Sequence, residues 1–329
     1  MNDKDRLKAE LQQLLYKKKH AQEIESDKQI LDPSLQGEII ERGEGLDDFY
    51  WNHSIEDVQF QKLAIEQGLC LSTFFQNQKI TDPEIQRLVI EKGEVLDIFF
   101  ENQKITNLEI QRLVIGKGEH LETFFKNQKI EDLELQKLVI EKGQSLDVFY
   151  KNQIVEDLGI QRLAIDKGKH LDIFLKNQNV TNTGLQYRIF KKGLHLDEFY
   201  RRQKITDIDL QRKILNKGEF LHLIYMNQTI EHPSIQRLAL SIDVDRTYFC
   251  LFQKITNTEI FKIALMMPWC SGIVLINQKI TDPKVQAFII KNEVDLDVFY
   301  KEQKIEDAGL LQMAVDKGLE LETLRKYQF

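Results

Sequence analysis

The sequence predicts an all-α protein in which short two-helix repeats stack into a solenoid. Residues 27–326 divide into twelve consecutive units of 25 residues without an insertion, and residues 77–101 show the pattern best: NQKITDPEIQRLVIEKGEVLDIFFE. The column that contains Ile80 holds Ile or Val in all twelve units. A helix of about eleven residues is only roughly 16 Å long and cannot bury its apolar face alone, so neighbouring units are expected to stack on one another.

The first helix of each unit is expected to begin directly after the column of Asp82. That column holds Asp or Asn in eleven units, with His232 as the exception. A short polar side chain there can accept hydrogen bonds from the free N–H groups of the first turn. Four prolines occupy the next column, where a missing N–H is harmless: Pro33, Pro83, Pro233 and Pro283.

Apolar spacing and a glycine column define the rest of the first helix. Ile85, Leu88 and Val89 have the i, i+3, i+4 spacing of one buried helical face. Gly93 can adopt the left-handed conformation that ends a helix. The same column holds Gly43, Gly68, Gly118, Gly143, Gly168, Gly193, Gly218 and Gly318.

A second, shorter helix is expected to begin directly after this glycine. Asp97 lies in its first turn, where the helix dipole favours an acidic side chain. Leu96, Phe99 and Phe100 are predicted to face the core, and the helix should end near Asn102.

The two ends of the chain lie outside the repeat. Residues 1–26 contain leucines at helical spacing, so an N-terminal capping helix is expected there. Residues 327–329 follow the last unit as a short C-terminal tail.

The unit that opens with Asn77–Glu84 resembles the repeats of HEAT-like α-solenoids. Its length of 25 residues is most similar to the leucine-rich-variant class of bacterial repeats. This resemblance covers residues 27–326 and implies a right-handed curved solenoid with a binding or scaffolding role and no catalytic residue. A second likeness is to the modular DNA-binding repeats of plant-pathogen effectors, which also place variable residues beside a glycine between two helices.

Composition narrows the functional classes. The chain has 45 basic and 52 acidic residues, a net charge of −7, which argues against a general nucleic-acid binder. No apolar run approaches the roughly 20 residues that a membrane helix needs, and Met1–Glu10 is too charged for a signal peptide. The three cysteines have no metal-ligand spacing, and their odd number suits a reducing compartment: Cys70, Cys250 and Cys270. A cytoplasmic location is therefore predicted.

Two glutamine columns, those of Gln78 and Gln86, each hold Gln in ten of the twelve units. Side chains that read different ligands in series should vary from unit to unit. Constancy favours a structural role, in which the amides bond to backbone groups of neighbouring turns.

The column of Val95 varies most and lies in the turn between the two helices. Three of its members are histidines, namely His120, His170 and His195. Units two apart would separate His120 from His170 by roughly 20 Å, whereas zinc needs its ligands within about 2.1 Å, so no metal site is predicted. Variable turn residues on a constant scaffold often encode recognition, so these four residues are candidates for partner binding. The alternative is that they are exposed residues free to drift.

A basic row precedes the glycine column and includes Lys92, Lys117, Lys142, Lys167, Lys192 and Lys217. Evenly spaced cations could follow a phosphate backbone, and this row carries the alternative prediction of nucleic-acid binding. The simpler interpretation is that lysine is favoured at a helix C-terminus by the dipole.

The units at 227–276 are degenerate. The changes are Asp243 and Pro268 in the glycine column and Arg246 and Ser271 in a core-leucine column. Because Pro268 cannot adopt a positive φ, the turn must take another shape, and a bend or shifted helix is expected between about residues 241 and 276. Met266, Met267 and Trp269 should then be pushed to the surface as a patch for a partner.

No glycine-rich phosphate loop, nucleophile with a positioned histidine, or metal-binding helix is present in the sequence. We therefore predict a scaffold without enzymatic activity or cofactor that binds a protein partner along its superhelical surface. A nucleic-acid-binding repeat protein is the alternative, and an enzyme is the third hypothesis.

Overall fold

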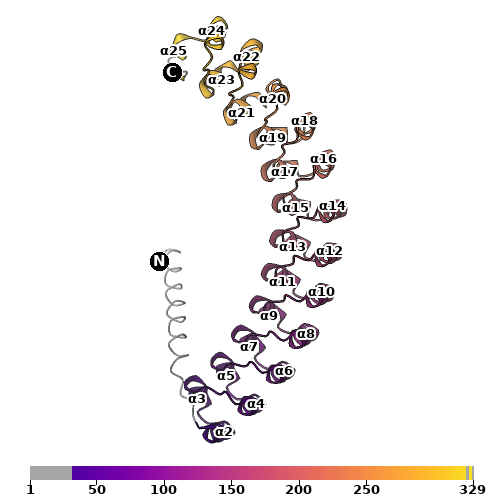
Figure 1. The fold of residues 1–329 in the computed structure, drawn as a ribbon, viewed down its shortest axis with the longest axis vertical. Coiled ribbons are helices and arrows are strands. Elements are labelled where there is room, and N and C mark those ends of the chain that lie inside the picture. The colour runs from indigo at the N-terminus through magenta and orange to yellow at the C-terminus, as the bar shows by residue number, and fades with distance from the viewer. Residues whose placement is uncertain (1–31, 324–325, 328–329) are drawn as a thin grey trace. The chain divides into compact units, whose positions relative to one another are not determined.

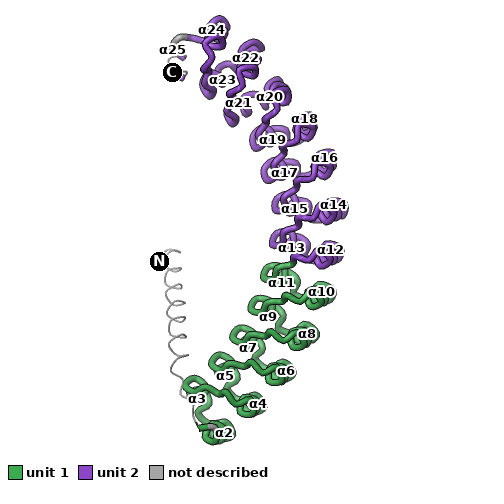
Figure 2. The backbone as a smooth tube through the Cα atoms, in the orientation of Figure 1, with its two compact units in different colours: residues 1–155 green, residues 156–329 purple. Residues whose placement is uncertain are grey.

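The computed structural model describes residues 32–323 and 326–327, and this part of the chain is all-helical, with no strand. The chain divides into two compact units, Met1–Val155 and Glu156–Phe329 (Figure 2). Within each unit the even-numbered helices form one row and the odd-numbered helices form another (Figure 1). The predicted capping helix at residues 1–26 lies outside the described residues.

In the first unit, helices of ten residues alternate with helices of seven. The longer helices are α2 (Pro33–Arg42), α4 (Val58–Gln67), α6 (Pro83–Lys92), α8 (Leu108–Lys117) and α10 (Leu133–Lys142). The shorter helices are α3 (Leu46–Asn52), α5 (Leu71–Asn77), α7 (Leu96–Asn102), α9 (Leu121–Asn127) and α11 (Leu146–Asn152). Each long helix packs on the next long helix, and each short helix packs on the next short helix.

The second unit has the same alternation. Its longer helices are α12 (Leu158–Lys167), α14 (Thr183–Lys192), α16 (Ile208–Lys217), α18 (Pro233–Ser241), α20 (Thr258–Leu265), α22 (Pro283–Asn292) and α24 (Ala308–Asp316). Its shorter helices are α13 (Leu171–Asn177), α15 (Leu196–Arg202), α17 (Leu221–Asn227), α19 (Arg246–Phe252), α21 (Ser271–Asn277), α23 (Leu296–Glu302) and α25 (Leu321–Thr323). All-α repeated packing, the coarse part of the predicted fold, is therefore present in both units.

The predicted helix boundaries of the repeat are confirmed. Asp82 Oδ1 accepts hydrogen bonds from Glu84 N at 2.8 Å and Ile85 N at 3.1 Å, which caps α6. His232, the exception in this column, has the same role, because its Nδ1 accepts from Ser234 N at 3.3 Å. Gly93 ends α6 with a φ of 77°, a left-handed conformation.

Apolar side chains from both the long and the short helices form the core. Phe99 and Phe100 are fully buried as predicted, and each is close to a ring of a neighbouring helix. The Phe75–Phe99 and Phe100–Phe124 ring centroids are 5.1 Å apart in edge-to-face geometry. Such pairs add roughly 0.5–1.5 kcal/mol each beyond the burial of their area.

The predicted buried face of the long helices is corrected in one respect. Ile85 and Val89 are buried, but Leu88 is only half-buried, and Gln86 and Ile90 take its place. The reason is that a long helix packs on long helices to either side, so its buried arc is wider and rotated relative to a single i, i+3, i+4 stripe.

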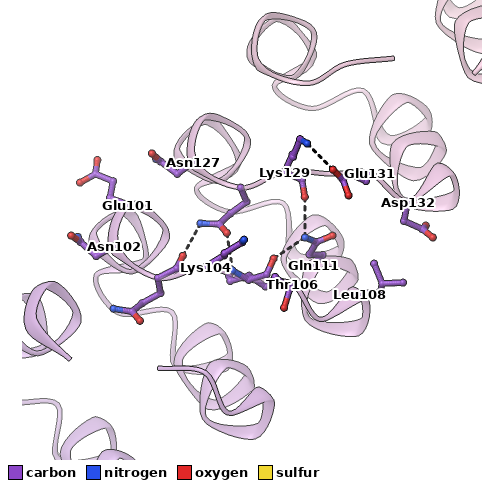
Figure 3. A pocket seen from close by; sticks show the side chains of 13 residues that line it. Glu101, Asn102, Lys104, Thr106, Leu108, Gln111, Asn127, Lys129, Glu131 and Asp132 are labelled. Atoms are coloured by element: carbon purple, nitrogen blue, oxygen red, sulfur yellow. Dashed lines mark hydrogen bonds and ion pairs between the residues drawn. The ribbon is translucent and has the colours of Figure 1, made fainter. Parts of the chain in front are cut away.

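The structural role predicted for the glutamine columns is confirmed, and it joins consecutive helix pairs. Gln103 donates from Nε2 to Phe75 O at 2.6 Å and to Gln78 O at 2.7 Å, while its Oε1 accepts from Ile80 N at 2.8 Å. Gln111, in the other column, donates to the carbonyls of Ile105 at 2.8 Å and Lys129 at 3.1 Å (Figure 3). These buried amides satisfy loop backbone groups that would otherwise have no partner.

Candidate functional site

A polar pocket lies between the loops that follow α7 and α9 (Figure 3). It has a volume of about 570 Å³, and the same columns line a pocket of about 880 Å³ beside α21 and α23. Lys129 Nζ pairs with Glu131 Oε1 at 2.7 Å, which raises the pKa of Lys129 and lowers the pKa of Glu131. Both pKa values therefore move further from pH 7. Neither group is poised to donate or accept a proton near that pH.

The Val95 column has an unexpected backbone conformation. Val95 has a φ of 49° and His120 a φ of 51°, in the left-handed region that disfavours side chains, β-branched ones above all. The column repeats this conformation at Gly45, Cys70, Ser145, His170, His195, Phe220, Asp245 and Asp295. The turn therefore imposes this left-handed geometry on residues of many types, with Cys270 as an exception.

The structure does not bring the four candidates of this column together. His120 Nδ1 lies 2.8 Å from Asp97 Oδ2 of the preceding helix pair, and Thr123 also donates to Asp97. Hydrogen bonds from Thr123 and His120 lower the pKa of the Asp97 carboxyl. Val95, His170 and His195 are exposed in separate turns. Within the described residues, no three His, Cys, Asp or Glu side chains are grouped so that they could hold a metal ion.

The basic row mainly caps neighbouring helices. Lys92 Nζ donates to Ile65 O at 2.7 Å and to Glu66 O at 3.1 Å, at the end of the preceding long helix. The equivalent bonds run from Lys117 to Ile90 O, from Lys142 to Gly116 O and from Lys192 to Asp166 O. These lysines therefore lie at the C-terminus of their own helix and also bind the C-terminal carbonyls of the preceding long helix. The helix dipole favours a positive charge at both places. Lys217 instead pairs with Glu219 at 3.1 Å, and Lys167 is exposed at the end of α12.

The degenerate turn has the altered shape that was predicted. Trp269 adopts a φ of 69°, whereas Cys270, in the column that is left-handed in most units, is right-handed with a φ of −91°. Trp269 is 85% exposed and Met266 59% exposed, whereas Met267 is half-buried. Exposure is therefore confirmed for Trp269 and Met266 and only partial for Met267. Instead of ten residues, α18 has nine and α20 has eight, and a bend at this place stays a prediction.

A larger apolar surface lies on the short helices of the same region. Met226, Leu251 and Ile276 occupy one column of α17, α19 and α21 and are 48%, 43% and 58% exposed. We call these three residues the apolar ridge. In the flanking short helices the same column holds Lys176, Arg201 and Lys301.

Aromatic side chains extend the ridge across two helices. The rings of Tyr248 and Phe252 stack with centroids 6.1 Å apart, and the ring of His222 on α17 lies 5.8 Å from that of Tyr248 on α19. A pocket of about 350 Å³ lies beside them, and Leu251, Phe252 and Asn277 contribute to its lining. Tyr248 and Phe252 are both exposed, so the ridge and the rings form one apolar surface across α17, α19 and α21.

The ridge was not predicted from the sequence, although a signal is present there. The column of Asp97, acidic in most units, becomes His222, Thr247 and Gly272 in the same three helices. Two solvent-facing columns therefore lose their charges together. The signal lies in a comparison of exposed columns, whereas the predicted patch rested on the broken glycine column.

No family model, curated protein or solved structure matches this chain. No helix in the described part of the chain is long and apolar enough to cross a membrane. The candidate site is therefore defined by its geometry alone. It consists of the apolar ridge, the stacked rings beside it and an exposed tryptophan in a turn of the same region.

Proposed function

We propose that the protein is a non-catalytic scaffold that binds a protein partner through the apolar ridge on α17, α19 and α21. The observation that carries this proposal is the coordinated loss of charge at two exposed columns in three consecutive helices. The glutamines that follow α17 and α19 are kept, and Gln228 and Gln253 retain their hydrogen bonds. Phe249 is buried in the core, whereas Arg246 and Ser271 replace the core leucine in α19 and α21.

Packing inside the protein does not explain the ridge. The same column holds Lys126, Lys151 and Lys176 in other short helices, so an apolar side chain is not needed there for stacking. Water contact with apolar side chains is unfavourable, and burying one against a partner contributes up to about 1.5–3 kcal/mol. Exposed Met266 and Trp269 lie in the turn before α21 and are available to the same partner.

We further propose that residues 27–326 form twelve repeats of the HEAT-like α-solenoid kind with right-handed stacking in each unit. The support is the recurrence of helix starts, as at Pro83, Leu108 and Leu133, together with the resemblance of the repeated segment. A binding role fits this architecture, because stacked repeats present long surfaces made of exposed columns.

The proposal is tested by restoring the lysines of the repeat. The triple variant Met226→Lys, Leu251→Lys, Ile276→Lys should fold, because lysine occupies this column elsewhere, and should lose the bound partner. The matched control is Lys126→Glu, Lys151→Glu, Lys176→Glu, with three changes in the same column of other helices. Affinity capture from cell extract, followed by quantitative mass spectrometry, compares the two with the unmodified chain.

Retention of the same proteins by the ridge variant would contradict the proposed function. The capture is run with and without nuclease treatment, because the basic row carries the alternative of nucleic-acid binding. Four lysines of that row already donate to helix-end carbonyls, which favours the structural interpretation: Lys92, Lys117, Lys142 and Lys192. Capture that depends on nucleic acid and not on the ridge would favour the alternative.

A further inference from the structure

We propose that the element docking on the apolar ridge is an amphipathic α-helix of the partner, with three apolar residues at heptad spacing and acidic residues one heptad beyond each end. This inference rests on the proposed function and specifies the chemistry of its partner. It is carried by two observations: the spacing of the ridge residues and the charges that flank them.

The spacing of the ridge fits a helix lying across α17, α19 and α21. The three ridge residues occupy equivalent positions on successively packed helices, whose axes are about 8–10 Å apart. In an α-helix, residues seven apart lie on nearly the same face and are separated by about 10.5 Å. A partner helix of about 15 residues would therefore place one apolar side chain against each ridge residue.

An extended strand does not match this spacing. Its same-face side chains recur every two residues, at about 6.6 Å or 13 Å, and neither distance agrees with the separation of packed helices. The shallow apolar surface, with the stacked Tyr248 and Phe252 rings along it, also offers a contact area for a helix rather than a free sheet edge.

The ridge column itself holds a basic residue at each end. Arg201 precedes Met226 in the same column, and Lys301 follows Ile276. Arg201 and Arg202 share a single carboxylate, that of Glu198, at 3.8 Å and 3.6 Å, so one positive charge remains there. Lys301 is exposed and has no ion-pair partner among the described residues. Carboxylates one heptad beyond the apolar residues would therefore meet a positive charge at each end.

Two more cations border the ridge at its loop edge. Lys254 and Lys279 are exposed, and neither has an ion-pair partner in the described part of the chain. The acidic column that balances lysines elsewhere is neutral here, with Thr247 and Gly272 in α19 and α21. Carboxylates of the next helix pair remain at this column, since Asp245 Oδ2 accepts from His222 N at 3.0 Å. The positive charges that an acidic partner could meet are therefore those of Lys254 and Lys279 at the loop edge and of the two ends of the ridge column.

A helix fits the ridge better than an anionic membrane does. The ridge side chains are about half-exposed, so part of each lies against its own helix. Insertion into acyl chains requires apolar side chains that project several ångströms from the surface, whereas a packed helix needs a shallow ridge.

The test uses the full chain and three synthetic peptides of about 32 residues with fluorescent labels. All three carry leucines at three heptad-spaced positions. The first has glutamates one heptad beyond each end, the second has lysines there, and the third is the first with a central proline. Fluorescence anisotropy at low and high salt measures binding. Vesicles of phosphatidylserine and phosphatidylcholine form the membrane arm of the experiment.

We expect the glutamate peptide to bind about tenfold more tightly than the lysine peptide at low salt, with a smaller ratio at high salt. The proline peptide should lose binding, because proline breaks the helix. In the variant Arg201→Glu, Lys301→Glu, the preference should reverse toward the lysine peptide, while circular dichroism shows an unchanged helix content.

Equal binding of the two charged peptides, full binding of the proline peptide, or stronger binding to the vesicles would overturn the inference. The capture experiment keeps this failure distinct from failure of the proposed function. If the ridge variant loses captured proteins but the peptides show no preference, the helix inference is wrong and the protein-binding function stands. If capture is unaffected by the ridge variant, the proposed function itself is wrong.

Discussion

The helix pairs α6–α11 and α16–α21 share part of their stacking interactions and differ most in their exposed columns. Phe99 and Phe124 in the first region correspond to Ile224 and Phe249 in the second, and all four are buried. The glutamine bonds recur in both regions with similar distances. At the ridge column, however, the first region has Glu101, Lys126 and Lys151, whereas the second has Met226, Leu251 and Ile276.

This difference shows that stacking and surface chemistry are separable in the repeat. The buried columns and the backbone-bonding amides determine how one pair sits on the next. The amides that follow the short helices are kept in both regions, whereas Arg246 and Ser271 replace the core leucine in the second. In α17 the exposed columns lose their charges while the core residues Leu221 and Ile224 stay buried. Where two exposed columns change together, we infer that the surface has a role other than stabilising the stack.

The largest expected loss of stability comes from replacing a buried glutamine. Making the same change in each region tests whether the two regions stack by equally strong interactions. Replacing Gln228 by Leu leaves the N–H of Ile205 and the carbonyls of Tyr200 and Gln203 without their buried partner. The loss should be about 2–4 kcal/mol of stability, measured by chemical denaturation and by hydrogen exchange of the adjoining helices. Gln103→Leu in the first region should have a similar effect, and a difference of several kcal/mol would break the comparison.

A smaller effect is expected at the glycine that ends each long helix. Gly218 has a φ of 75°, and a Cβ placed on it would meet no atom within 4 Å. The cost of Gly218→Val should therefore come from backbone strain alone, about 2 kcal/mol, and Gly143→Val in the first region should behave alike. Thermal melts provide the measurement. An unchanged midpoint in either variant would contradict the left-handed helix end.

Substitution by glycine in the Val95 column should raise the stability, in contrast to the loss expected when the helix-ending glycine is replaced. Val95 is held at a φ of 49° and Phe220 at 54°, so glycine relieves strain at both. Because a β-branched side chain is the less tolerant of this conformation, Val95→Gly should stabilise by about 0.5–1 kcal/mol and Phe220→Gly by less. Denaturation midpoints of the two variants decide the order, and destabilisation by Val95→Gly would show that its side chain packs favourably in the turn.

The smallest effect on stability is expected at the ridge itself. Because the ridge side chains are exposed, each of the changes Met226→Lys, Leu251→Lys and Ile276→Lys should alter stability by no more than about 0.5 kcal/mol. The proposed loss of partner binding would then occur in a folded protein. Thermal melts check this separation, and a loss of several kcal/mol would assign the ridge to the core rather than to recognition.

Local features of the repeat could be predicted because they depend on residues close in sequence. The capping side chain of Asp82, the left-handed Gly93 and the buried Phe99 and Phe100 all follow from spacing within one unit. The half-burial of Leu88 was not predicted, because the buried arc of α6 depends on helices at either side. The positive φ in the Val95 column was also missed, since a column that holds many residue types carries no glycine signal.

The sequence by itself determined the all-α class, the helix boundaries and the structural role of the glutamines, because helix caps, apolar spacing and constancy are properties of each unit. Only the tertiary structure decided which backbone groups these side chains reach. Lys92 bonds to the end of the preceding long helix, and Gln103 bonds to the loop of the preceding pair. It also decided that Met226, Leu251 and Ile276 share one exposed surface, because residues 25 apart become neighbours only when their helices stack.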